Sequence, residues 1–274
     1  MANTLSYPLP RGASIRRFLR GASFKALAPW GVPVLLILVW QLLVQFGWIS
    51  TRVLPSPISV VQAGIELAKS GELFHHVKVS AWRAIAGFAI GGGIGFILGL
   101  LNGTFNLSER LLDTSVQMLR NIPHLAMIPL VILWFGIGEE AKIFLVSVGV
   151  LFPIYINTFH GIRTVDPGLL EMGKVYGLKP HELFWQIVLP SALPSILVGV
   201  RYALGIMWLT LIVAETIAND AGIGYMAMNA REFLQTDVVV FSILLYALLG
   251  KLADSIARWL EARLLQWHPS YQEG

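Results

Sequence analysis

The chain lacks cysteine entirely, and only 13% of its 274 residues are charged. Without cysteine it can form neither disulfides nor thiolate metal sites. Soluble domains carry about 25% charged residues, so half that share indicates that lipid surrounds much of the chain. Acidic residues are also missing from the N-terminal region, since the first one in the chain is Glu66. The composition therefore predicts an integral membrane protein.

Basic residues gather before the first apolar stretch, at Arg11, Arg16, Arg17, Arg20 and Lys25. A basic tail beside an apolar span is typical of a topology signal, and we do not expect nucleic acid as a partner. A cleaved signal peptide is not expected either, because the basic region and the apolar stretch 27–49 are too long and no A-x-A site follows. Residues 1–26 are predicted to be a basic cytoplasmic arm.

Hydropathy predicts an all-α, polytopic membrane helix bundle with about six transmembrane helices, since each crossing needs about 20 mostly apolar residues. The third span is interrupted by Arg120, Asn121 and His124, and Pro123 and Pro129 are expected to kink or break it. The predicted spans are 27–47, 82–102, 115–136, 141–160, 191–215 and 238–259.

The distribution of charge between the spans predicts the orientation of the chain in a plasma (inner) membrane. The basic arm places the N-terminus in the cytoplasm. Alternation then puts the acidic loop 136–142 outside and the basic loop 161–190 inside. The transmembrane domain is expected to cover 27–264, and 265–274 to form a cytoplasmic tail.

Glycines recur every fourth residue in the second span, at Gly87, Gly91, Gly95, Gly99 and Gly103. Spacing of four puts all five on one helix face, where they would let another backbone approach closely. We expect a helix-packing groove, although a generally glycine-rich membrane helix would look similar.

The loop between the fourth and fifth spans contains strong start and stop signals for helices. Asp166 is a good N-cap, and Pro167 suits the first helical position. Gly177 is expected to end this first short helix, Pro180 to start a second, and Pro190 to close the segment. The two amphipathic helices need a partner for their apolar face. Lipid headgroups or a groove on a soluble protein would serve equally well.

This loop resembles the cytoplasmic signature of permease subunits of ABC importers, which reads Glu-Ala-Ala, three residues, Gly, nine residues, Ile-x-Leu-Pro. Met172 and Gly173 stand where the family has two alanines, and the spacing matches at every step. The resemblance implies a type I ABC importer permease-like fold and a coupling helix that docks on an ATPase subunit. The residues it marks for coupling are Glu171, Met172, Gly173, Gly177, Leu178, Ile187, Leu189 and Pro190.

Further stretches look like the sulfonate, taurine and nitrate branch of that family, and the chain is most similar to its aliphatic sulfonate members. The similarity covers roughly residues 27 to 271. It implies import of an aliphatic sulfonate, with taurine, nitrate or another small anion as alternatives. The stretches are 118–126, 129–136, 209–216, 222–233 and 250–254.

The sequence has no Walker loop, because Gly250 and Lys251 are followed by Leu252 rather than Ser or Thr. An ion gradient, as in a secondary transporter, or a separate ATPase would have to supply the energy. The resemblance favours two cytoplasmic ATPase subunits that bind the ATP, a second copy of this chain, and a periplasmic or extracellular anion-binding protein. We expect no catalytic residues, no cofactor and no metal site, since His75 and His76 lack a third ligand nearby.

Charges within the predicted spans are costly and need an account. Arg120 and His124 lie four apart on one face, beside the Pro123 break, and could guide an anion. Alternatively, Arg120 snorkels or pairs with Asp113 or Glu109. Glu215 is either a gate or contact between subunits, on a possible substrate path with the first two, or a solvated helix end. Lys251 and Asp254 are expected to pair within one helix.

Overall fold

The computed structural model describes residues 31–217 and 220–267, in which all regular structure is helical. The chain divides into two compact units, Met1–Val61 and Gln62–Gly274. The predicted basic arm, 1–26, lies outside the described residues. So does most of the predicted tail.

The first unit contains an apolar helix, Gly31–Gln45. It is shorter than the roughly 20 residues that a crossing needs. The predicted first span, 27–47, begins before the described residues, so only this part of it is seen. The indole nitrogen of Trp40 donates to the carbonyl oxygen of Pro55 at 3.0 Å, which ties the helix to the segment that follows it.

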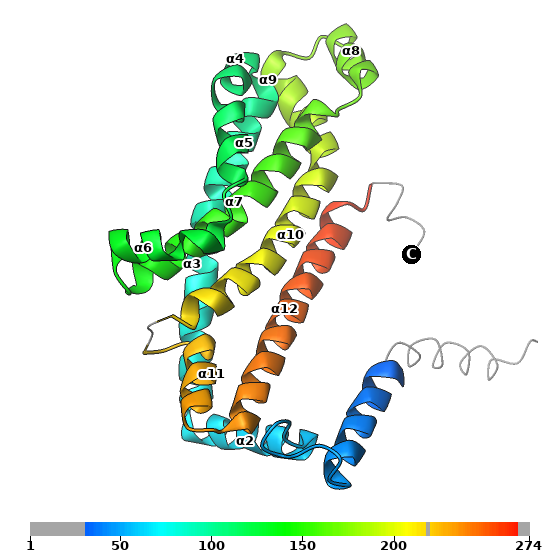
Figure 1. The fold of residues 1–274 in the computed structure, drawn as a ribbon. Helices are drawn as coiled ribbons and strands as arrows, with labels where there is room; N and C mark the ends of the chain where they lie inside the picture. Colours follow the sequence, from blue (N-terminus) through cyan, green and yellow to red (C-terminus); the bar gives the residue numbers. More distant parts are fainter. Residues whose placement is uncertain (1–30, 218–219, 268–274) are drawn as a thin grey trace, which may run out of the picture. The chain divides into compact units, whose positions relative to one another are not determined.

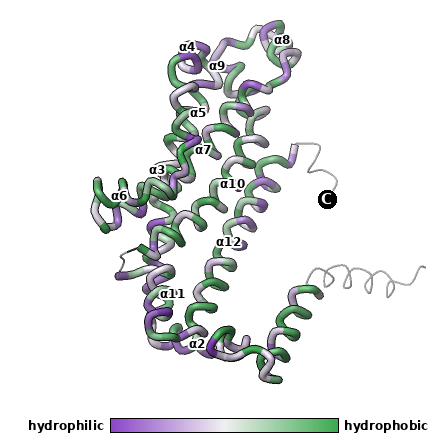
Figure 2. The backbone as a smooth tube through the Cα atoms, in the orientation of Figure 1, coloured by the Kyte–Doolittle hydropathy of each residue, from purple (hydrophilic) through white to green (hydrophobic). Residues whose placement is uncertain are grey.

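Four helices in the second unit are long and apolar enough to cross a membrane, which confirms four of the six predicted spans. They are α3 (Glu72–Thr104), α7 (Glu139–Arg163), α10 (Leu189–Glu215) and α12 (Thr236–Leu264). The helix that ends as α10 begins at Pro180. These four run alongside one another, with α8 (Pro167–Val175) at one end of the group and α11 (Ile223–Glu232) at the other (Figure 1). Apolar residues cover much of their length (Figure 2).

The predicted third span is a broken one. Its two halves, Asn106–Arg120 and His124–Phe135, meet at an angle of 79°. Pro123 lies in the break with an extended backbone, as expected for a residue without an N–H to donate. Pro129 breaks nothing, contrary to prediction, because it occupies the first turn of α6 (Ile128–Phe135), where no helical N–H is needed. The remaining elements are α2 (Pro57–Ser70), α4 (Asn106–Ser108), η1 (Glu109–Asp113), α5 (Thr114–Arg120), η2 (His124–Met127), α9 (Pro180–Leu183) and η3 (Phe184–Val188).

The glycine stripe on α3 lies buried against α7. A Cβ atom built on Gly91 would lie 2.0 Å from the backbone oxygen of Ser147, and one on Gly95 would lie 2.3 Å from the oxygen of Leu151. Even alanine would therefore push the two backbones apart. The other members of the stripe, Gly87, Gly99 and Gly103, meet side chains of α7 at similarly short distances.

Candidate coupling loop and polar sites of the membrane helices

The first helix of the loop begins as the sequence predicts. The Asp166 carboxylate accepts a hydrogen bond from the backbone N–H of Gly168 at 2.7 Å, and Pro167 is the first helical residue. This N-cap satisfies one of the four backbone donors that a helix start leaves without an intrahelical partner.

The end of α8 is a Schellman motif built on Gly177, which has a φ of +79°. The N–H of Gly177 donates to the carbonyl of Lys174, and the N–H of Leu178 donates to that of Gly173, both at 3.0 Å. A Cβ atom at Gly177 would meet nothing within 4 Å, so glycine is needed here for its conformation and not for space.

The second helix of the loop packs back onto Gly173. A Cβ atom there would lie 2.5 Å from Leu183 Cδ1 and 2.7 Å from Ile187 Cδ1. The glycine that replaces the second alanine of the family signature thus lets α8 lie close to the helix that follows it.

Pro190 does not close the loop, contrary to prediction. The helix that begins at Pro180 runs without interruption to Glu215. It widens into the π-helix η3 just before Pro190, which lies in the first turn of α10. A proline offers no N–H to the carbonyl four residues earlier, and the widened turn accommodates that loss without ending the helix. The loop is therefore continuous with a membrane helix.

The tip of the loop exposes apolar side chains. Val175 is 86% exposed and Tyr176 80%, and Met172 and Leu169 are also exposed. Of the predicted coupling residues, Glu171 and Met172 lie on this outer side, whereas Leu178 lies near Gly173 and Leu189 packs on a buried cluster of α7 and α10. An exposed apolar tip on a well-anchored elbow is suited to docking against another protein.

The predicted path residues do not share a face. Arg120 ends α5 and is exposed, and His124 follows the 79° break. His124 Nε2 instead lies 3.0 Å from the hydroxyl of Thr210 on α10. The alternative pairing of Arg120 with Asp113 or Glu109 is not formed: Asp113 accepts from Tyr155 at 2.5 Å, and Glu109 pairs with Arg163.

Glu215 is not a solvated helix end, because its side chain is fully buried. Its carboxylate accepts from Arg83 Nη1 at 2.7 Å, from Tyr246 at 2.9 Å, and from the hydroxyl of Ser80 at 2.8 Å. The N–H of Gly224 adds a fourth hydrogen bond, at 3.0 Å. The contact of Glu215 with cargo stays a prediction.

The sequence did not predict Arg83 as the partner of Glu215. Arg83 is fully buried on α3, and its guanidinium also donates to the Glu139 carboxylate at the start of α7. This group, which we call the Arg83 cluster, joins α3, α7, α10, α11 and α12 through Arg83, Glu139, Glu215, Gly224 and Tyr246. A charged residue at the edge of an apolar span signals that Arg83 needs a polar partner, but not which residue that partner is.

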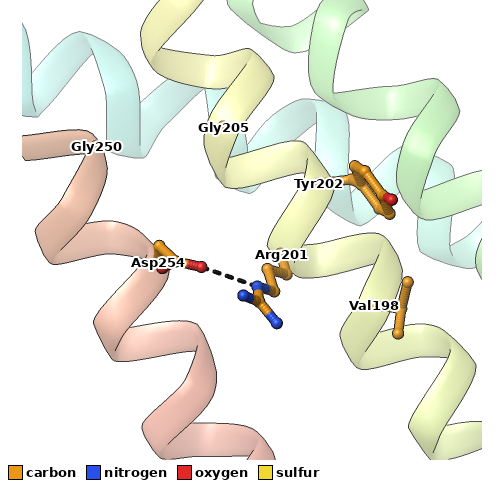
Figure 3. Close-up of a pocket in the computed structure, with 6 residues that line it drawn as sticks. All are labelled: Val198, Arg201, Tyr202, Gly205, Gly250 and Asp254. Carbon is orange, nitrogen blue, oxygen red and sulfur yellow. Dashed lines mark hydrogen bonds and ion pairs between the residues drawn. The ribbon is translucent and has the colours of Figure 1, made fainter. Parts of the chain in front are cut away.

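A second group of charges lies between α10 and α12. Arg201 Nε donates to Asp254 Oδ1 at 2.8 Å (Figure 3). Asp254 also pairs with Arg258 at 2.8 Å and with Lys251 at 3.5 Å, which confirms the predicted pair within α12. A cavity of about 520 Å³ opens beside them, lined by Val198, Arg201, Tyr202, Gly205, Gly250 and Asp254.

Comparisons with known proteins assign this chain to a family. Residues 91–266 match the family described as "Binding-protein-dependent transport system inner membrane component". A protein named as the aliphatic sulfonates transport permease SsuC of Escherichia coli (strain K12) is 65% identical over 89% of this chain and 93% of its own length. The taurine transport system permease TauC of the same organism is 32% identical over 88% of this chain and 90% of its own.

Among solved structures, the inward-facing MetNI methionine ABC transporter is 23% identical over 65% of this chain and 93% of its own, with a TM-score of 0.47. The four apolar helices, together with the matches to transport permeases, define the class of the protein, a helical membrane permease. More particularly, the chain belongs to the family of inner-membrane components of binding-protein-dependent transport systems.

Proposed function

We propose that this chain is the membrane permease of an ATP-driven importer for aliphatic sulfonates. The observation that carries the cargo assignment is the 65% identity to a permease named for aliphatic sulfonates transport, which extends over 89% of the chain. Identity to the taurine permease is half as high, at 32%, so the sulfonate is the better supported cargo.

The coupling loop 161–190 is where the energy enters. Its exposed tip, around Val175 and Tyr176, docks in a cleft of a cytoplasmic ATPase. Because the second half of the loop is one continuous helix with α10, a displacement of the tip moves a membrane helix directly. This continuity is what a device that converts nucleotide-driven motion into alternating access requires.

One loop engages one ATPase, so two ATPase subunits call for two copies of the permease. Both termini lie in the cytoplasm in this arrangement, and the loop between α6 and α7 lies outside, where a soluble anion-binding protein delivers the cargo. ATP binding brings the two ATPases and the coupling loops together and opens the pore outward.

Uptake of a radiolabelled alkanesulfonate into vesicles that hold the permease with its ATPase and binding protein tests this function. We expect uptake to require ATP inside and to persist when an uncoupler collapses the ion gradients. Uptake that survives ATP depletion and stops with the uncoupler would instead indicate a secondary transporter.

The cargo is tested in the same vesicles by competition. An unlabelled alkanesulfonate should inhibit uptake at lower concentration than taurine, nitrate or sulfate does. If taurine, which is an aminosulfonate, or nitrate competes best, the permease assignment stands and the assignment to simple alkanesulfonates fails.

A further inference from the structure

We propose that the cavity between α10 and α12 binds the anionic head of the cargo during its passage, with Arg201 as the residue that contacts it. This inference rests on the proposed function and adds to it a site inside the membrane. It starts from the cavity of about 520 Å³ shown in Figure 3, in which Arg201 and Asp254 face each other from neighbouring helices.

Arg201 lies near the middle of the membrane. α7 spans 139–163, so its midpoint is near Leu151. Gly199 on α10 lies against Pro153 and Asn157 of α7, and Gly149 lies against Thr210 farther along α10. Arg201 is thus level with the middle of a helix whose length, about 37 Å, is close to the thickness of the membrane.

The charged side chains of the cavity are partly exposed. The Arg201 side chain is 42% exposed and that of Asp254 31%. Charged side chains at this depth are costly when they face hydrocarbon, and they face water-filled paths or protein instead. The cavity therefore lies on an aqueous path or against another protein surface, and not against lipid.

The charged groups beside the cavity carry a net positive charge. Asp254 is shared by three cations, Arg201, Lys251 and Arg258. Glu261 adds a second carboxylate, 3.8 Å from Arg201 Nη1. Three positive and two negative groups leave one positive charge in excess, which a singly charged sulfonate or another small anion would neutralise. An arginine that is only partly engaged by its acid keeps N–H groups for such an anion while holding it weakly enough for release.

The cavity also offers open space. A Cβ atom at Gly205 or Gly250 would meet nothing within 4 Å, so both glycines border open space. Val198 and Tyr202 add apolar surface beside the charges, which suits a cargo with a short alkyl chain behind an anionic head.

The absence of native cysteine makes a clean labelling experiment possible. Gly205→Cys and Gly250→Cys would be treated, in vesicles holding the complete importer, with an anionic sulfonatoethyl and a cationic trimethylammonium-ethyl methanethiosulfonate. Gly93→Cys is the matched control: it also has open space around it, and it lies between Gly91 and Gly95, which contact the same middle part of α7. Its neighbours Ile90, Ile94 and Ile97 form an exposed apolar surface.

We expect both cavity cysteines to react and Gly93→Cys to stay unreactive. Relative to a free thiol, the anionic reagent should be favoured by at least about tenfold, the effect of one charge-assisted hydrogen bond. Ethanesulfonate should slow the reaction. Adding Arg201→Gln should remove both the preference and the protection, and Arg201→Lys should restore part of each.

Several results would overturn the site. Unreactive cavity cysteines combined with loss of the dimer in Arg201→Gln would show a contact between two copies of the chain. Equal rates with both reagents, or protection that persists in Arg201→Gln, would show a path that Arg201 does not guard. Failure of the proposed cargo is seen separately, in wild-type uptake. If another anion is imported and protects the cysteines in the same Arg201-dependent way, the cargo assignment fails and the anion site stands.

Discussion

Arg83 and Glu215 form an ion pair in which Nη1 lies 2.7 Å from Oε1 and both side chains are fully buried. The two residues are far apart in the sequence, on α3 and α10. Gly222 and Gly224 allow the chain that follows α10 to close over them, since a Cβ atom on either glycine would lie 2.5 Å from an atom of Glu215. The pair thus holds α11 at one end of the helix bundle.

Removing one member of this pair should strongly destabilise the permease. Arg83→Met leaves a buried carboxylate without its cation and should lower the free energy of unfolding by about 3–5 kcal/mol. Glu215→Gln leaves Arg83 with one charged partner fewer and should also be destabilising. The melting temperature of the purified protein in detergent measures the effect. Disruption of the exposed pair of Glu109 and Arg163 by Glu109→Gln should cost at most about 1 kcal/mol.

The double variant Arg83→Met, Glu215→Met separates the cost of a broken pair from the value of the pair itself. It should recover part of the stability lost in Arg83→Met, because no buried charge then lacks its partner. Losses that simply add would mean that the two residues act independently, against the geometry described above.

Long-range polar contacts of this kind could not be predicted from the sequence. Arg83 and Glu215 carry no local pattern that links them, and Ser80 of α3 and Tyr246 of α12 complete the cluster. The broken third span shows the same limit. Pro123 predicted the break, but the separation of Arg120 from His124 depends on a bend angle that the sequence does not encode locally.

Packing of α3 on α7 should tolerate no side chain at the centre of the glycine stripe. Gly91→Ala puts a methyl group onto the backbone oxygen of Ser147, which cannot move without shifting α7, and should cost about 1–3 kcal/mol. Gly93→Ala, two residues away on an open face, should be neutral or slightly stabilising, because alanine favours the helix. Melting temperatures of the two variants compare them directly, and equal effects would contradict close packing.

Local features, in contrast, could be predicted well. Asp166, Pro167 and Gly177 specify how α8 begins and ends through bonds to neighbouring backbone groups, so the sequence alone was sufficient. Pro190 was misread because proline is compatible with the first turn of a helix as well as with its end. Only the helix preceding it, with its π-helical turn, decides between the two.

The exposed tip of the coupling loop should contribute to binding an ATPase and not to folding. Tyr176→Ala removes a side chain that is 80% exposed, so the melting temperature should stay unchanged. The amount of ATPase that copurifies with the permease should fall by at least about tenfold if Tyr176 is an interface anchor. Phe233→Ala, an exposed aromatic residue at the opposite end of the second unit, should leave ATPase copurification unchanged.

The conformation of Gly177 should matter more for coupling than for stability. A β-branched residue is strained at a φ of +79°, so Gly177→Val should disrupt the Schellman motif, misplace the tip and abolish ATP hydrolysis stimulated by substrate and binding protein, while the protein still inserts in the membrane. Gly136→Val is the matched control, since Gly136 has a φ of +71° and equally open surroundings, in the turn between α6 and α7. With a ψ of −161°, Gly136 lies in a region that is essentially restricted to glycine, so valine is at least as strained there, and Gly136→Val should still keep stimulated hydrolysis because it lies away from the coupling loop. Gly177→Asn, which tolerates the left-handed conformation, should restore part of the activity. Full stimulation in Gly177→Val, or equal loss in Gly136→Val, would show that the bend of the loop does not transmit the motion.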